Sequence, residues 1–406
     1  MEYTLFAVTA PGVEGITARE VRALTPHPQP LPPLPTHFVG RGGRGEAGGI
    51  EYKGSLRDLY RANLHLRTVN RMLVRLGEFY AAAFSELRKK ASRLPWGNFL
   101  VPGQPVTLRV TCHKSRLYHS EAVAERVAGA IEDRLGKAAS HVKGQEADEA
   151  SSSTQMIVVR LMRDKCTISV DSSGALLHQR GYRLATAKAP LRETLAAAIV
   201  LASGWDLTSP LLDPFCGSGT IPIEAALMAM GIPPGRSRRF AFMDWPSFDA
   251  ALWESVLAES SSLSPTPWPP ILASDRDAGA IEAARANAAR AGVANAIEFS
   301  CRAVSAIEPP PRSGWLVTNP PYGVRLGEEK ALVEFYPKLG DVLKKQFTGW
   351  RAYLLSADMR LPKLIHLAVS KRTPLFNGAL ECRLFEYKMV QGEMRKKKVD
   401  ALSDLT

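Results

Sequence analysis

The sequence predicts an α/β fold whose second half is a mostly parallel sheet with helices on both faces. From about residue 191, short apolar runs alternate with helical stretches, a pattern typical of doubly wound sheets. Near the end, Asn377-Gly378 separates two strand-like runs, and Asn-Gly between strands is a strong signal for a hairpin. We therefore expect an antiparallel pair to close the sheet, and the first half, which lacks this alternation, to fold separately.

Composition restricts the class of protein. The 406 residues suffice for two or three domains, each with its own core. No apolar run approaches the ~18 residues of a membrane span, and the first residues lack the features of a secretion signal. The five cysteines are scattered, without Cys-x-x-Cys or histidine at ligand spacing. We therefore expect a cytoplasmic protein with reduced thiols and no metal site.

Positive charge is concentrated in the first half of the chain. Residues 1–190 hold 27 Lys and Arg against 17 Asp and Glu, whereas residues 191–406 hold 25 against 23. Nearly all of the formal net charge of +12 therefore belongs to one half. This asymmetry indicates a surface for nucleic acid, with a basic but passive surface as the alternative.

The first half is predicted to contain short strands and helices interrupted by an insertion. We expect strands at 3–8, 106–112, 156–161 and 166–170, and helices at 13–24, 56–66, 85–94 and 122–135. Residues 26–35 contain six prolines and residues 40–49 are mostly Gly and Arg, so neither segment can pack a core. The Gly-Arg repeat is interpreted as a surface loop, with contact to RNA phosphates as the alternative.

In the second half, the elements expected between residue 191 and the hairpin follow one another closely. We expect strands at 211–216, 271–274, 297–300, 316–318 and 352–356, helices that include 220–230, 278–290 and 331–346, and hairpin strands at 371–376 and 379–387. Residues 260–270, rich in Ser and Pro, are expected to form a surface loop.

A glycine-rich turn follows the first of these strands. In Asp213-Pro214-Phe215-Cys216-Gly217-Ser218-Gly219-Thr220, a strand end passes through two glycines into a helix. Open α/β sheets bind ligands at this edge, and glycine lets the backbone approach a ligand closely, so the turn suits a nucleoside cofactor. A dinucleotide is disfavoured because Pro222 occupies the place of its third glycine.

The next acid at a strand end is Asp275, which lies 62 residues after Asp213, whereas dinucleotide folds place it ~20 residues on. We predict that Asp275 accepts hydrogen bonds from the ribose hydroxyls of the cofactor, with a plain loop carboxylate as the alternative. Asp277 begins a helical stretch and is predicted to be its N-cap.

A second motif, Asn319-Pro320-Pro321-Tyr322, follows another strand and is expected at the same edge. An exocyclic amine conjugated to its ring is a poor nucleophile. The amide oxygen of Asn319 and the carbonyl of Pro320 can accept its two N–H bonds and aim its lone pair, while the prolines fix the backbone. Tyr322 offers a stacking face for a base taken out of its helix. Together the two motifs predict methyl transfer from S-adenosylmethionine to a nucleobase nitrogen, without a general base.

With segments of the first half, these motifs resemble the bacterial THUMP-domain guanine-N2 methyltransferases, in the stand-alone version that forms N2-methylguanosine in large-subunit ribosomal RNA. The other segments that carry the resemblance are Ala10–Gly15, Tyr60–Leu64, Leu94–Trp96, Lys114–Ser120, Arg180–Arg183, Ala189–Glu193 and Asp244–Asp249. Most are weak singly, but their order over about residues 3–390 is specific.

The resemblance implies a domain organisation. It consists of an α+β ferredoxin-like domain at 1–68 with the insertion at 26–49, a THUMP RNA-binding domain at 69–172, a linker at 173–190, a Rossmann-like class I methyltransferase domain at 191–393 and a basic tail at 394–406. Within the THUMP segment, Lys114, Arg116 and Tyr118 would contact RNA through phosphate binding and stacking, with ordinary surface residues as the alternative.

The resemblance also implies the cofactor contacts. They would come from the turn between Asp213 and Thr220, from Asp275 and Arg276, and from Asn319. Where the family has an acid near the adenine, this chain has Ala303. Three alternatives are open: a backbone amide suffices to hold the adenine, Ser305 takes the place of the acid, or the cofactor binds weakly.

The function predicted is methylation of the 2-amino group of a guanosine, in 23S ribosomal RNA rather than transfer RNA. An adenine-N6 methyltransferase is the first rival, because the same pocket accepts either amine. A non-catalytic RNA-binding protein with a decayed cofactor site is the second.

Overall fold

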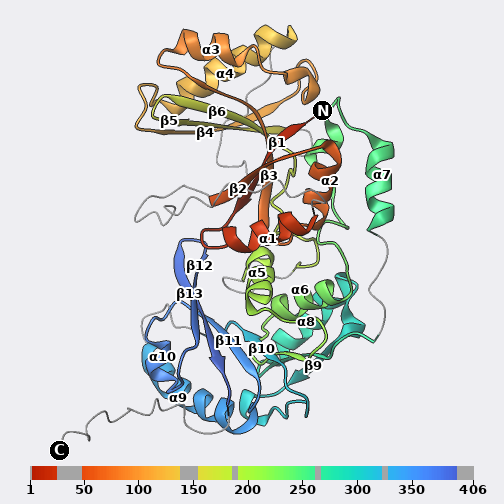
Figure 1. The fold of residues 1–406 in the computed structure, drawn as a ribbon, viewed down its shortest axis with the longest axis vertical. Helices are drawn as coiled ribbons and strands as arrows, with labels where there is room; N and C mark the ends of the chain where they lie inside the picture. Colours follow the sequence, from red (N-terminus) through yellow and green to blue (C-terminus); the bar gives the residue numbers. More distant parts are fainter. Residues whose placement is uncertain are drawn as a thin grey trace, which may run out of the picture.

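The computed structural model describes residues 2–24, 48–137, 154–184, 191–260, 267–321 and 328–390, which form two sheets stacked end to end (Figure 1). The strands are β1 (Tyr3–Thr9), β2 (Gly48–Gly54), β3 (Val69–Tyr80), β4 (Val106–His113), β5 (Gln155–Met162), β6 (Lys165–Asp171), β7 (Leu211–Asp213), β8 (Ile271–Asp275), β9 (Ile297–Cys301), β10 (Trp315–Thr318), β11 (Arg351–Ser356), β12 (Lys371–Asn377) and β13 (Leu380–Lys388). The α-helices are α1 (Glu14–Leu24), α2 (Leu56–His65), α3 (Phe84–Ala91), α4 (Ser120–Leu135), α5 (Glu193–Ser203), α6 (Thr220–Ala229), α7 (Ala250–Glu259), α8 (Ala278–Arg290), α9 (Glu328–Gln346) and α10 (Leu361–Leu364).

The N-terminal sheet contains strands of both the predicted ferredoxin-like domain and the predicted THUMP domain. Its strand order is β2-β1-β3-β6-β5-β4. Its centre is β3, which pairs antiparallel with both β1 and β6. Strand β3 was not predicted, because residues 71–74 are buried without interruption and the alternation that signals a half-buried strand is absent there. Gly48 and Gly49 were assigned to the insertion, whereas both pair with β1, since a strand ladder needs only backbone groups. The rest of the insertion lies outside the described residues.

The second sheet confirms the predicted class: β7 to β11 are parallel, and β12 and β13 close the sheet as an antiparallel hairpin, in the order β12-β13-β11-β10-β7-β8-β9. Helices cover both faces. Leu211 faces a core formed with α5, α6 and α8, while its neighbour Leu212 faces α9 and α10. Helix α5 was not predicted, because residues 193–200 are all buried and an all-round apolar helix has no amphipathic period.

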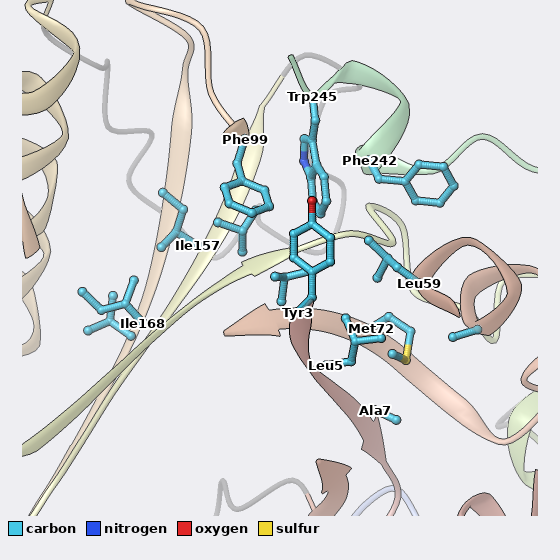
Figure 2. Close-up of a cluster of buried hydrophobic side chains, with 14 of the residues drawn as sticks. Tyr3, Leu5, Ala7, Leu59, Met72, Phe99, Ile157, Ile168, Phe242 and Trp245 are labelled. Carbon is cyan, nitrogen blue, oxygen red and sulfur yellow. The ribbon is translucent and has the colours of Figure 1, made fainter. Parts of the chain in front are cut away.

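One segment of the catalytic half packs into the N-terminal core. Phe242 stacks on Tyr60 with ring centroids 4.5 Å apart, and Trp245 meets Phe99 edge-on at 4.8 Å. Figure 2 shows Trp245 beside Phe99 and Tyr3 within this core. The indole Nε1 of Trp245 donates to Gln155 Oε1 over 2.8 Å. We call residues 240–256 the aromatic strap; the sequence analysis did not anticipate it.

The hairpin meets the N-terminal half at the Pro11-Gly12 corner. Gly12 has φ +86°, and a Cβ there would lie 2.5 Å from the carbonyl oxygen of Pro374 in β12. The corner therefore requires glycine both for its left-handed backbone and for close approach.

We expect Gly12→Ala to lower stability by ~2 kcal/mol or more, from the left-handed strain together with displacement of the hairpin. Gly15 in α1 is the matched control, because a Cβ there meets no atom within 4 Å and Ala should stabilise the helix by ~0.5–1 kcal/mol. Thermal unfolding of both variants checks this. Equal melting temperatures would contradict the tight corner.

Candidate functional site

The two sequence motifs meet at the point where the strand order reverses. Asp213 ends β7 and Thr318 ends the neighbouring β10, and the chain proceeds from β7 to β8 on one side and from β10 to β11 on the other. Such a switch point opens a crevice at the carboxyl ends of the strands. Thr318 Oγ1 donates to Asp213 Oδ1 over 2.6 Å, and the Phe215 amide donates to the same oxygen over 3.1 Å. The bond holds the glycine-rich turn and the Asn-Pro-Pro segment together.

Burial makes the carboxyl group of Asp213 a weaker acid than an ordinary aspartate. Its side chain is almost inaccessible, and burial raises the pKa of its carboxyl to about 7, with the neighbouring Asp275 contributing in the same direction and the bonds from Thr318 and Phe215 opposing it.

The glycine-rich turn is held from the next strand. The amide of Cys216 donates to the Ser274 carbonyl over 3.0 Å, and the amide of Gly217 donates to Asp275 Oδ2 over 3.0 Å. Both Gly217 and Gly219 have positive φ, but they differ in surroundings. A Cβ at Gly219 would lie 3.0 Å from the Ala284 side chain, whereas one at Gly217 would meet nothing. Gly219 thus serves helix packing, and Gly217 presents its backbone to open space that a cofactor can approach.

Asp275 is half-buried and bridges two loops, because its other oxygen accepts the Asp277 amide over 3.1 Å. Carboxylate oxygens have further lone pairs, so the ribose contact stays a prediction compatible with these bonds. Asp277 is confirmed as the N-cap of α8, accepting the amides of Gly279 and Ala280.

The loop after β9 lies next to the loop after β8, since the Arg302 amide donates to the Asp275 carbonyl over 2.9 Å. Arg276, Ala303 and Ser305 are all exposed on these two loops. The structure therefore brings the predicted adenine position to the same edge as the turn, with no side-chain acid at Ala303.

Asn319 has the feature expected of an amine acceptor. Its Oδ1 is buried and has no hydrogen-bond partner within the described residues. Buried polar oxygens are normally paired, so this oxygen is available to a ligand. The following backbone is fixed by Tyr336 of α9, whose hydroxyl donates to the Pro321 carbonyl over 2.9 Å. Pro320 is buried at the same turn; Tyr322 lies outside the described residues.

Several supporting residues escaped the sequence analysis. Asn287 of α8 donates to the Ser218 carbonyl over 3.0 Å, and Arg183 of the predicted linker donates to Thr220 Oγ1 over 2.7 Å. Thr318 and Tyr336 belong to the same group. The one available signal was position, since Thr318 directly precedes Asn319.

The three predicted RNA contacts lie on one loop between β4 and α4. Lys114, Arg116 and Tyr118 are exposed, while Leu117 between them is buried. Tyr118 is 68% exposed and its ring lies 4.1 Å from that of His119. The backbone amide of Arg116 donates to Asp164 Oδ1 over 2.6 Å, which fixes the backbone of the loop at this residue. Their contact with RNA stays a prediction.

Family comparison identifies the domains. The family described as RMKL-like, methyltransferase domain, matches residues 180–386, a THUMP domain matches residues 81–171, and an RlmL ferredoxin-like domain matches residues 40–73. The chain belongs to the RMKL-like methyltransferase family. The family and the three-part architecture predicted from the sequence are therefore confirmed, while the exact domain limits stay predictions.

Two relatives differ in how much of them the chain covers. A protein of Synechocystis sp. with the provisional name RNA methyltransferase is 35% identical over 95% of this chain and 96% of its own. The ribosomal RNA large subunit methyltransferase K/L of Methylococcus capsulatus is 36% identical over 83% of this chain but only 46% of its own. The chain thus spans about half the length of the K/L relative.

Two solved structures share the whole architecture. A methyltransferase crystallised with SAH is 28% identical with a TM-score of 0.81, covering 97% of this chain and 99% of that one. A Listeria monocytogenes protein described as a predicted N6-adenine-specific DNA methylase is 32% identical with a TM-score of 0.81, covering 95% and 96%. The predicted cofactor, S-adenosylmethionine, is confirmed at the level of the family, since SAH is its demethylated form.

Membrane-spanning helices and metal-binding groups are both absent from the described residues. These residues contain no helix long and apolar enough to cross a membrane and no group of three or more His, Cys, Asp or Glu placed to hold a metal ion.

The raised pKa of Asp213 predicts a specific pH dependence of stability. Between pH 3.8, the ordinary pKa of an aspartate side chain, and pH about 7, the folded protein keeps a proton that the unfolded chain releases. The contribution of Asp213 to stability is therefore full below 3.8 and is lost as the pH rises through about 7. Asp213→Asn should remove this loss, so the melting temperature of the wild type relative to the variant should fall across the interval. The exposed cap variant Asp277→Asn is the control; parallel curves for wild type and Asp213→Asn would contradict the assignment.

Proposed function

We propose that this protein transfers a methyl group from S-adenosylmethionine to the exocyclic 2-amino group of a guanosine in large-subunit ribosomal RNA. The observation that carries the proposal is the buried amide oxygen of Asn319, which has no partner among the residues that the structure describes, at the switch point of a methyltransferase domain. An oxygen in this position accepts one N–H of an amine, and the adjacent Pro320 carbonyl would accept the other.

The residues at the edge suit the cofactor. Gly217 leaves open space above its backbone, and Asp275 stands beside it with lone pairs to spare. When bound there, S-adenosylmethionine supplies an electrophilic methyl group. The protein contributes position: the Thr318–Asp213 bond fixes Asn319 relative to the turn, and Tyr336 fixes Pro321. Holding both amine hydrogens draws the nitrogen lone pair out of conjugation and orients it, which is the near-attack geometry that accelerates transfer.

Relatives and charge both support ribosomal RNA as the substrate. Curated relatives at about 35% identity are named ribosomal RNA large subunit methyltransferases K/L, and a THUMP segment with an excess of basic residues precedes the catalytic domain. Ribosomal RNA is therefore the proposed substrate and the cytoplasm the proposed location. Transfer RNA would preserve the chemistry with another substrate.

A second candidate is adenine-N6 methylation. The Listeria structure described as a predicted N6-adenine-specific DNA methylase shares this architecture, and Asn319 would accept an adenine amine equally well. The RNA-binding segment favours the guanosine reading.

Asn319→Ala should lower kcat on the order of 10²-fold or more, because it removes an acceptor that orients the amine during transfer. Asn319→Asp keeps an acceptor oxygen and should lose less activity. Cofactor affinity, measured by titration calorimetry, should change little in either. Near-wild-type turnover by Asn319→Ala would refute the amine pocket.

The modified nucleoside tests the proposal itself. The protein is incubated with tritiated S-adenosylmethionine and total RNA from a strain lacking its gene, and the RNA is fractionated and digested to nucleosides. We expect label as N2-methylguanosine in large-subunit ribosomal RNA. Label in transfer RNA would change the substrate, label as N6-methyladenosine would change the base, and no label would favour a non-catalytic RNA-binding protein.

A further inference from the structure

A cavity of about 280 Å³ lies between the N-terminal half and the catalytic half. Its walls come from the corner after β1, from β3, from the start of α5 and from the hairpin turn. The lining residues are Thr9, Ala10, Pro11, Asn70, Arg192, Thr194, Leu195, Phe376, Asn377 and Gly378. The cavity shares no residue with the amine pocket or the cofactor turn, and none of the described residues that line it is a carboxylate.

The cavity lies toward the same sheet edge as Asn319. The last turn of α5 lies at the amino end of β10, where Trp315 Nε1 donates to the Ser203 carbonyl over 3.1 Å, so the first turn of α5 points toward the carboxyl edge. The hairpin also extends past that edge. Ser356, the last residue of β11, pairs with Arg383 of β13, and the pairing of β12 with β13 continues beyond this point to Asn377 and Leu380 at the turn. Only β11 separates β13 from β10, a lateral distance of ~10 Å.

Three polar side chains of the lining, those of Thr9, Asn70 and Arg192, can donate hydrogen bonds into the cavity. Thr9 is 1% exposed, yet its Oγ1 has no partner within the described residues. Thr194 Oγ1 donates to Asn70 Oδ1 over 2.8 Å, which orients the Asn70 amide with its N–H groups turned to other acceptors. Arg192 is exposed at the N-cap of α5, and its side chain makes no capping hydrogen bond to the helix. The one acid of that first turn, Glu193, pairs with Arg183.

The electrostatic surroundings match this donor set. Burial, followed by the positive charges of Arg192 and three further arginines, lowers the pKa of His178 to about 4. The positive end of the α5 dipole adds to this potential. Phe376, Pro11 and Leu195 supply an apolar wall. A concave site with a few convergent polar groups on apolar walls is typical of a ligand pocket, and this one selects an anion with a planar or apolar part.

We infer that this cavity binds a nucleotide of the RNA strand next to the target guanosine, with Arg192 and Asn70 on its phosphate, Thr9 donating to its sugar or base, and Phe376 against its apolar face. The inference rests on the proposed function, since it gives the substrate a second contact beside Asn319. It explains why the cavity is built jointly by the N-terminal and catalytic halves: an RNA strand leaving the amine pocket along the carboxyl edge meets it before the THUMP segment.

Arg192→Gln tests the phosphate contact on the full chain. We expect the Kd for an unmodified large-subunit ribosomal RNA transcript to rise about tenfold, with the slope of log Kd against log salt falling by about one. Affinity for S-adenosylmethionine should not change. Arg312→Gln is the matched control, because Arg312 is an exposed arginine just before β10, at the opposite edge of the sheet.

Thr9→Val provides a second, nearly isosteric test. It removes an unpaired buried hydroxyl, so the melting temperature should hold or rise while RNA affinity falls a few-fold. A purely structural role would instead lower the melting temperature and leave RNA affinity unchanged.

The outcomes separate this inference from the proposed function. If the wild type methylates RNA but Arg192→Gln and Arg312→Gln have equal RNA affinity and salt slope, the cavity is not an RNA subsite and the proposed function stands. If both variants weaken RNA equally, the effect is general charge and the inference fails. If the wild type binds the transcript through this cavity but transfers no methyl group, the RNA contact at the cavity stands and the proposed function fails.

Discussion

The placement of the RNA-binding half over the catalytic edge depends on the aromatic strap. Phe242, Trp245 and Trp253 leave the catalytic half and are buried among Tyr60 and Phe99. Removing one such side chain from a core typically costs ~3–5 kcal/mol, so the strap is a major part of the N-terminal core rather than a surface contact. The strap includes most of α7, so a segment from within the catalytic half is part of the N-terminal core.

Residues of the predicted linker also fix how the two halves are oriented relative to each other. Arg180 and Tyr182 both reach the buried Glu224 of α6, and Arg180 also donates to the Arg67 carbonyl over 2.5 Å. Buried ion pairs contribute little net stability because their desolvation is costly, but they permit few alternative arrangements. The network therefore acts mainly on orientation. It holds α6, which begins at the cofactor turn, in a fixed relation to the N-terminal half, so the two halves present one continuous edge.

Sequence reasoning recovered what depends on local pattern. The strands and helices around Asp213, Asp277 and Asn319 lie within a few residues of the prediction, because strand–helix alternation, caps and turn residues are local signals. It failed where burial is complete or contacts are long-range. Residues 193–200 of α5 and residues 71–74 of β3 lack periodicity because these residues are buried without interruption. The strap has no sequence signal of its own until Tyr60 is placed beside it. The Thr318–Asp213 bond joins residues 105 apart, which no spacing rule indicates.

The strap also determines when the protein can fold. A ribosome releases the N-terminal sheet first, but that sheet lacks Phe242, Trp245 and Trp253 until synthesis has passed α7. Until then Tyr60 and Phe99 face an incomplete core. The N-terminal core therefore reaches its final packing only after residues 240–256 of the catalytic half have been made.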